Sequence, residues 1–187
     1  MRDLNIKVHF YSPWHCGSGL SAGADADSLV IKDIHGLPFI PGKTIKGLIR
    51  EAVEDYACLK GIDIDLTEAF GKETSTDDFA PSGKLFFTNA ELSPKEKQSI
   101  LSNHVGEYLY NNKVATAIDP ETGSTQEHSL RTIETTIPCD LHAMILDVEE
   151  PLVEIIEPAL GFIKRMGTGR NRGLGRCKFT IEKGDKA

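Results

Sequence analysis

A glycine- and arginine-rich segment near the C-terminal end is the clearest candidate for binding chemistry. Residues Gly167–Arg176 contain four glycines and three arginines. Glycine lets the backbone approach a ligand closely, and arginine binds phosphate through paired hydrogen bonds. An ordinary turn between a helix and a strand is the alternative, but the arginine density argues against it. The segment predicts a phosphate-binding loop in which Arg170, Asn171, Arg172 and Arg176 contact the ligand.

A second candidate lies at the start of a strongly amphipathic stretch, where Gly42, Lys43, Thr44 and Lys46 stand together. The first turn of a helix offers unpaired amides and a partial positive charge, so lysines and a hydroxyl beside it favour a backbone phosphate as ligand. A solvated first turn is the alternative. Because cations oppose the helix dipole at this end, their presence favours a function, and Arg50 extends the same cationic segment.

Gly42-Lys43-Thr44 also resembles the end of a nucleotide-binding P-loop, Gly-x-x-x-x-Gly-Lys-Ser/Thr. The spacing does not fit, because the nearest upstream glycine, Gly36, leaves five intervening residues. Pro38 and Pro41 also remove amide donors from the stretch that would surround the phosphates. The sequence therefore argues against a nucleotide triphosphatase.

Charge is distributed unevenly along the chain. Its 187 residues carry 21 Lys and Arg against 28 Asp and Glu, a net charge of −7, which argues against a general polyanion binder. Residues 164–178, however, hold six cations and no acid, leaving 15 cations against 28 acids elsewhere. We expect one basic edge on an acidic body. Such an edge can hold a phosphate backbone, because counterion release depends on the phosphates contacted.

Hydrophobic periodicity predicts an α+β fold. Alternation over 4–10 indicates a strand, and apolar residues at helical spacing from Lys43 indicate a helix ending near Gly61. The other expected elements are strands at 84–92, 141–148 and 174–181, a short helix after Ser93-Pro94, and a second packed helix at 151–165. A polar stretch at about residues 111–135 predicts an inserted hairpin arm. This order resembles one ferredoxin-like unit, a single domain over residues 1–187.

The composition also predicts the protein's surroundings. No stretch approaches the ~20 apolar residues that a membrane span requires, and the N-terminus leads directly into a strand pattern. The four cysteines are widely spaced, unlike those of zinc sites or redox motifs. We therefore expect reduced thiols, a cytoplasmic location and no membrane partner.

Three segments together resemble, in order, the signature blocks of the RAMP superfamily of CRISPR-associated RNA-binding proteins: Ser12–Gly19, Phe39–Arg50 and Gly167–Arg176. The resemblance covers most of the chain and is nearest to the repeated backbone subunit of type III effector complexes. It implies a ferredoxin-like (RRM-like) RAMP domain with an arm, or thumb. It also implies guide RNA (crRNA), target RNA and neighbouring copies of itself or paralogous effector subunits as partners.

The same resemblance implies a site for target cleavage. Asp27–Asp33 is similar to the family segment whose first aspartate cuts target RNA, which makes Asp27 the expected catalytic residue and a ligand for Mg²⁺. Asp25 lies two residues earlier and is a second candidate, because the alignment of this segment with the family pattern does not decide between the two aspartates. The arm would push between guide and target and so bring a target phosphate to Asp27. A non-catalytic scaffold subunit and a guide-processing RAMP ribonuclease are the alternatives.

His15 follows Trp14 in the first glycine-bearing loop. Single-stranded bases commonly stack on histidine and tryptophan, so His15 is a further candidate for RNA contact.

Overall fold

An antiparallel sheet forms the centre of the molecule. The computed structural model describes residues 1–23, 26–72, 83–126 and 129–182. The strand order is β2-β4-β7-β1-β8, and β3 also pairs with β7. The strands are β1 (Arg2–Phe10), β2 (Phe39–Ile40), β3 (Phe86–Phe87), β4 (Ala90–Glu91), β7 (Asp140–Val148) and β8 (Cys177–Glu182).

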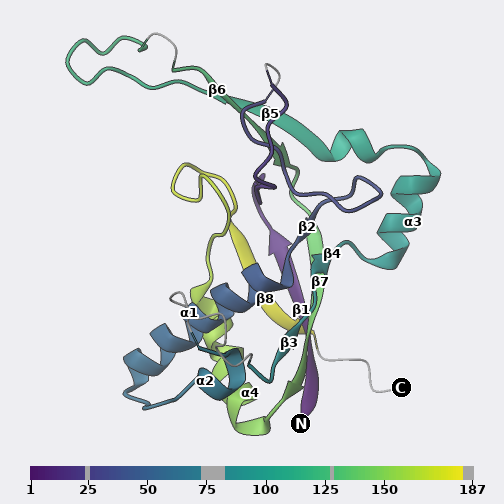
Figure 1. The fold of residues 1–187 in the computed structure, drawn as a ribbon, viewed down its shortest axis with the longest axis vertical. Helices are drawn as coiled ribbons and strands as arrows, with labels where there is room; N and C mark the ends of the chain where they lie inside the picture. The colour runs from purple at the N-terminus through teal and green to yellow at the C-terminus, as the bar shows by residue number, and fades with distance from the viewer. Residues whose placement is uncertain (24–25, 73–82, 127–128, 183–187) are drawn as a thin grey trace.

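Two helices cover one face of this sheet, as Figure 1 shows. They are α1 (Gly42–Lys60) and α4 (Glu150–Ala159), which pack against each other; a third, short helix is α2 (Thr67–Phe70). The side chains of Ile6 and Val8 in β1 point into this layer, whereas Lys7 and His9 lie on the opposite face. The chain order β1, α1, β3 and β4, β7, α4, β8 confirms the predicted α+β, ferredoxin-like arrangement.

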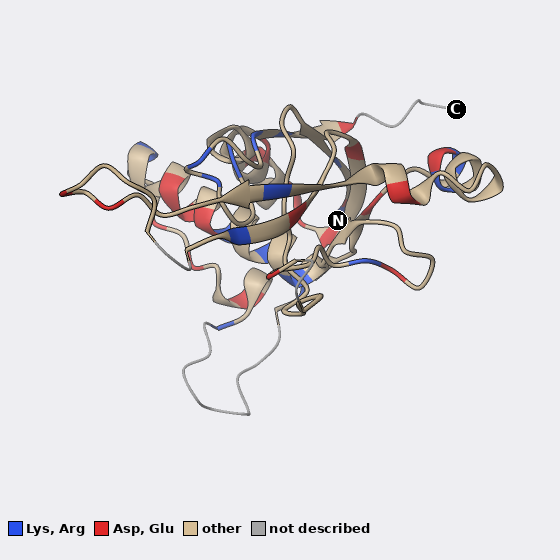
Figure 2. Cartoon of the chain, turned by 90° about the horizontal axis from the view of Figure 1, so that it is seen from above, with Lys and Arg blue, Asp and Glu red and all other residues tan. Residues whose placement is uncertain are grey.

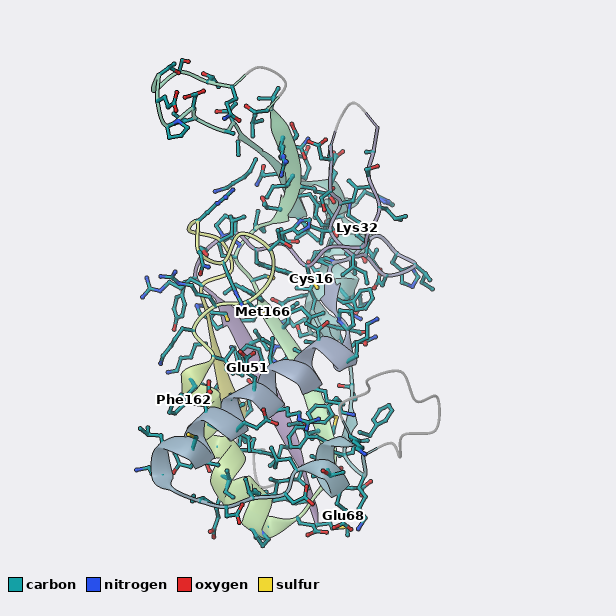
Figure 3. All side chains as sticks on the ribbon, turned by 60° about the vertical axis from the view of Figure 1, so that its left-hand side comes forward. Cys16, Lys32, Glu51, Glu68, Phe162 and Met166 are labelled. Carbon is teal, nitrogen blue, oxygen red and sulfur yellow. The ribbon has the colours of Figure 1, made fainter. Side chains whose placement is uncertain are left out.

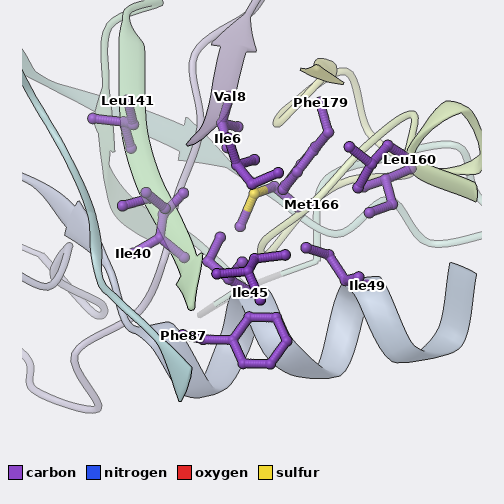
Figure 4. Packing of buried hydrophobic residues seen from close by; sticks show 14 of the residues in the cluster. Ile6, Val8, Ile40, Ile45, Ile49, Phe87, Leu141, Leu160, Met166 and Phe179 are labelled. Carbon is purple, nitrogen blue, oxygen red and sulfur yellow. The ribbon is translucent and has the colours of Figure 1, made fainter. Parts of the chain in front are cut away.

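The core between the sheet and α1 also anchors the glycine-rich loop. In Figure 4, the sulfur of Met166 lies between Ile6 of β1 and Ile45 of α1. All three side chains are almost fully buried in one apolar cluster. Since Met166 immediately precedes the loop and Ile45 lies between Thr44 and Lys46, both predicted binding segments are attached to the same part of the core.

The predicted arm is a two-stranded hairpin that projects from the body (Figure 1). Strands β5 (Tyr110–Ala115) and β6 (Arg131–Thr136) pair antiparallel from Tyr110↔Thr136 to Ala115↔Arg131. Most of β5 is exposed. Helix α3 (Pro94–Ser102), with a capping box between Ser93 and Glu96, and the turn η1 (Gly106–Leu109) lead into the arm.

Some elements differ from the sequence prediction. The strand expected at 84–92 is two short strands. Between them, the Thr88 hydroxyl accepts a hydrogen bond from the Met144 amide, and the side-chain Oδ1 of Asn89 accepts one from the Gly42 amide. The last strand begins at Cys177 and not at 174. Helix α4 gives way after Ala159 to the turn η2 (Leu160–Phe162), and Pro158 stands in its last turn.

All four cysteines are free thiols. Burial raises the pKa of the Cys177 thiol to about 12, and burial is also the main cause that raises the pKa of Cys139 to about 11. Neither thiol is therefore activated for nucleophilic chemistry. Of the helices in the described ranges, none has both the length and the apolar character for a membrane crossing.

Candidate nucleic-acid interface

The glycine-rich loop is held in place through its backbone, which leaves its side chains free for other contacts. The Gly175 amide donates to the Pro13 carbonyl at 2.8 Å, and the Thr168 amide donates to the His15 carbonyl at 2.9 Å. Within the loop, the Arg172 amide donates to the Gly169 carbonyl at 2.7 Å. The loop is thus a closed turn fastened to the segment that follows β1.

Two glycines are required by this geometry. A Cβ atom at Gly175 would lie 1.9 Å from the Met166 carbonyl oxygen, and one at Gly167 would lie 2.2 Å from that of His15. Both residues also have φ in the left-handed region, +66° and +82°. Part of the glycine content therefore serves close backbone packing, and not direct ligand contact.

The polar side chains of the loop are exposed: Arg170, Asn171, Arg172 and Arg176. Among the described residues, none of the three arginines has an ion-pair partner. The guanidinium of Arg176 lies over the ring of Tyr11, 5.4 Å from its centroid. The loop therefore presents positive charge and planar donors to the solvent, which suits an anionic ligand.

At the start of α1, Gly42 has a structural role. Its amide donates to Oδ1 of Asn89 at 2.9 Å, and a Cβ atom would lie 2.2 Å from the Phe87 carbonyl oxygen. One of the amides expected to face a ligand is therefore occupied. Lys43 is exposed, and Thr44 and Lys46 are half-buried; within the described ranges, neither lysine forms an ion pair.

Arg50 does not belong to this cationic surface, which corrects the sequence prediction. Its Nε donates to Oε1 of Glu54 at 2.8 Å and its Nη1 donates to the Gly71 carbonyl at 3.0 Å. Its side chain is only 19% exposed. Arg50 joins α1 to the end of α2, so its Nε and Nη1 donate within the chain.

The glycine-rich loop lies beside α1. Arg170 and Asn171 line a cavity of about 360 Å³ together with Leu48 and Glu51 of α1. In Figure 3, Met166 lies between the glycine-rich loop and Glu51 of α1. Figure 2, viewed from the arm, shows Lys and Arg in blue on several segments, with Asp and Glu in red among them.

His15 is buried, with 1% of its surface exposed, so its expected contact with RNA is wrong. Its Nδ1 lies 2.6 Å from the Glu134 carbonyl oxygen, which can only accept, so Nδ1 donates. Its Nε2 lies 3.1 Å from the Ser28 hydroxyl. With the Thr168 contact to its backbone, His15 connects the first loop, the arm and the glycine-rich loop.

Glu134, which the sequence did not single out, supports the same junction. Its carboxylate accepts a hydrogen bond from the Val30 amide at 3.0 Å and pairs with Lys32 at 2.8 Å. Lys32 in turn lies 3.8 Å from the ring centroid of Tyr110. The only feature of the sequence that could have drawn attention to Glu134 is an acid within the β-branched run of β6. Its partners, Val30 and Lys32, lie about a hundred residues away in the chain.

Asp27 is exposed and lies at the base of the arm. Its amide donates to the Thr132 carbonyl at 2.8 Å, and its Oδ2 accepts from the Thr132 amide at 2.7 Å. Asp25 lies outside the described residues. The part of the chain that the structure covers contains no cluster of three or more His, Cys, Asp or Glu side chains able to hold a metal. Asp27 can therefore supply one oxygen ligand to a cation, and the remaining ligands would have to come from elsewhere.

Comparison with known proteins identifies relatives of this arrangement. The family model described as RAMP superfamily matches residues 7–178. Two solved structures with similar chains are a type III-B Cmr-beta complex bound to cognate target RNA (TM-score 0.71, 10% identity, 97% of both chains covered) and the same kind of complex in its apo state (TM-score 0.70, 13% identity, 98% of both chains). No curated protein sequence is similar enough to count as a relative.

Proposed function

The chain belongs to the RAMP superfamily, and from this premise we propose that it is a backbone subunit of a type III CRISPR effector complex that binds guide RNA. The full-length structural similarity to chains of type III-B complexes, one of them bound to target RNA, supports this proposal. The observation that carries it is the glycine-rich loop: its exposed Arg170 and Arg172 pair with no acid among the described residues, and its backbone is joined through His15 to β6 of the arm.

Guide binding would use the backbone phosphates. Arg170 and Arg172 would bind phosphates through charge-assisted hydrogen bonds, and Lys43 and Lys46 would act as point charges on the same side. Such contacts carry no sequence information, so one subunit can bind guides of any sequence. This is the property that a repeated backbone subunit needs.

Target cleavage would take place at the base of the arm. Inserted between guide and target, the arm would unstack a base pair and turn the adjacent target phosphate towards Asp27. The two hydrogen bonds with Thr132 fix the position of Asp27 relative to β6. RNA bound along the arm would therefore have a defined position relative to the Asp27 carboxylate. Asp27 would position the ribose 2′-hydroxyl for in-line attack on that phosphate.

Mg²⁺ is part of the proposal, with Asp27 as its ligand from this chain. Magnesium is commonly held by one or two carboxylates together with phosphate oxygens and water. Asp27 could supply one such carboxylate, since the described residues contain no larger cluster of metal ligands. Bound there, the ion would stabilise negative charge at the scissile phosphate.

A guide-processing ribonuclease is the enzyme alternative. His15 is buried and is therefore removed as its candidate base. A non-catalytic scaffold subunit uses the same binding surface and differs only at Asp27. It is therefore separated from the proposal by an activity measurement.

The proposal is tested by isolating the tagged chain from its native host and identifying what is bound to it. We expect a defined set of small RNAs, several copies of the chain per RNA, and other effector subunits. Copies would join head to tail, since an acidic body and a basic edge are complementary. Recovery of the chain without RNA would contradict the proposal.

A further inference from the structure

A second cationic surface lies beyond the glycine-rich loop, beside the edge strand β8. The antiparallel pairing of β1 with β8 places His9 opposite Lys178, and the Tyr11 amide donates to the Arg176 carbonyl at 2.8 Å. An isolated bridge then places Arg165 opposite Arg176. The side chains of three separate segments are thereby brought into one row at this edge.

This row lines a cavity of about 490 Å³, which we call the edge pocket. It has four cations and no acid among its lining residues: Lys164, Arg165, Arg176 and Lys178, with Tyr11 beside them. Within the described ranges none of the four pairs with a carboxylate; the Arg165 Nη1 instead donates to the Arg170 carbonyl at 3.2 Å. Glu51 and Asp55 line a neighbouring cavity, which also includes Lys164 and Arg165.

Such an arrangement is unfavourable without a ligand. Like charges placed directly opposite each other in paired strands destabilise the pairing, and Arg165 faces Arg176. The chain has 28 acids, yet none lines this pocket. An anion bound here would remove the repulsion, so the composition of the pocket indicates an anionic ligand.

Tyr11 indicates that the anionic ligand also carries an aromatic base. Its side chain is half-exposed, and its ring is held by an edge contact with His9 at 4.4 Å and by the guanidinium of Arg176. Aromatic rings and guanidinium planes both provide stacking surfaces for unpaired bases. A concave surface that combines stacking planes with cations suits a nucleotide, which offers both a base and a phosphate.

We infer that the edge pocket is an additional site for single-stranded RNA, in which a base stacks on Tyr11 and the adjacent phosphates are bound by the four cations Lys164, Arg165, Arg176 and Lys178. The inference rests on the proposed function and extends it, because the RNA would continue from the glycine-rich loop across the β8 edge. Lys164, Arg165, Lys178 and Tyr11 thereby become RNA contacts in addition to the loop arginines.

The test measures binding of a labelled single-stranded RNA of mixed sequence to the full chain at several salt concentrations. The triple variant Lys164→Gln, Arg165→Gln, Lys178→Gln should bind more weakly, and its salt slope should fall by about 2, since each phosphate contact on a single strand contributes roughly 0.7. The matched control, Lys60→Gln, Lys72→Gln, Lys95→Gln, removes the same charge from exposed positions elsewhere and should keep the wild-type slope.

Stacking is tested separately. Tyr11→Ala should weaken RNA binding about fivefold or more, Tyr11→Phe should retain it, and neither should change binding of inorganic polyphosphate, which has no bases.

The control for the proposed function is Arg170→Ala with Arg172→Ala. If this pair weakens RNA binding while the edge-pocket variants bind as wild type, the inference is overturned and the proposed function stands. If the triple variant loses self-association, measured by light scattering without RNA, but keeps its RNA affinity, the pocket is a protein interface and the inference is wrong. Unchanged binding in every variant would overturn both.

Discussion

Asp27 and Thr132 are joined by two hydrogen bonds, although 105 residues separate them: the Asp27 amide donates to the Thr132 carbonyl at 2.8 Å, and the Asp27 carboxylate accepts from the Thr132 amide at 2.7 Å. The carboxylate proposed for catalysis is thus attached to the arm proposed to reshape the RNA. The position of this carboxylate is therefore fixed relative to the base of the arm.

This contact allows charge and structure to be separated by mutation. Asp27→Asn retains an oxygen acceptor for the Thr132 amide but removes the negative charge, whereas Asp27→Ala removes both. In the assembled complex with Mg²⁺, we expect both variants to lower target cutting by about 100-fold or more, a range typical of losing a proton-transfer or positioning group. Guide affinity should be unchanged.

The alternative register is tested in parallel with Asp25→Asn. Loss of cutting in that variant alone would transfer the catalytic role to Asp25. Wild-type complex that binds target without cutting it would identify the chain as a scaffold subunit.

The glycine-rich loop depends on Gly175 for its shape. Gly175→Ala places a Cβ atom against the Met166 carbonyl at a residue with positive φ, so we expect a loss of about 3 kcal/mol or more in unfolding free energy. Gly173 has φ of +85° but open space around it, and Gly173→Ala should cost only about 1–2 kcal/mol. Equal melting temperatures for the two variants would contradict the described packing.

His15 is expected to act through structure and not through RNA contact. His15→Ala leaves the Ser28 hydroxyl and the Glu134 carbonyl without their partner and opens a cavity, which should cost about 2–4 kcal/mol in thermal or chemical unfolding. His35→Ala, at an exposed position, is the control and should be close to neutral. If His15→Ala kept wild-type stability but bound RNA more weakly, the result would support a direct contact between His15 and RNA.

The ion pairs of Asp140, on the face of the sheet opposite the helices, should make the free energy of unfolding depend on pH. Burial raises the pKa of Asp140, but its contacts with Lys7 (2.7 Å) and His9 (2.5 Å) outweigh burial, and the net result is a lowered pKa. Because the folded-state pKa is lowered, this contribution is present above the ordinary value of 3.8 and is lost as pH falls through the lowered pKa.

The difference in unfolding free energy between wild type and Asp140→Asn should therefore be largest near neutral pH and shrink in acid. Asp63→Asn, at an exposed position, serves as control. A difference that stays constant from neutral pH to below 3.8 would show that the ion pairs do not stabilise the fold.

Local patterns in the sequence were sufficient to locate the elements whose apolar residues repeat with one clear period. Alternation identified β1, and helical spacing of apolar residues identified α1 to within one residue at each end. The cations of the glycine-rich loop were also identified correctly as exposed, because charge density is itself a surface property.

Contacts between distant segments could not be predicted in this way. Arg50 and His15 have the residue types of RNA contacts, but Gly71 and Glu134 occupy their polar atoms. The division of the strand at 84–92 likewise depends on the Gly42 amide reaching Asn89, 47 residues away. Such partners are fixed by tertiary packing, and no local period encodes them.

The most direct test of the account is the salt dependence of guide RNA affinity in the four-site variant Lys43→Ala, Lys46→Ala, Arg170→Ala, Arg172→Ala. We predict strongly weakened binding and a salt slope lower by about 3, from roughly 0.7 for each lost phosphate contact. Wild-type affinity and slope in this variant, with the fold intact, would contradict the claim that these two segments bind one RNA backbone.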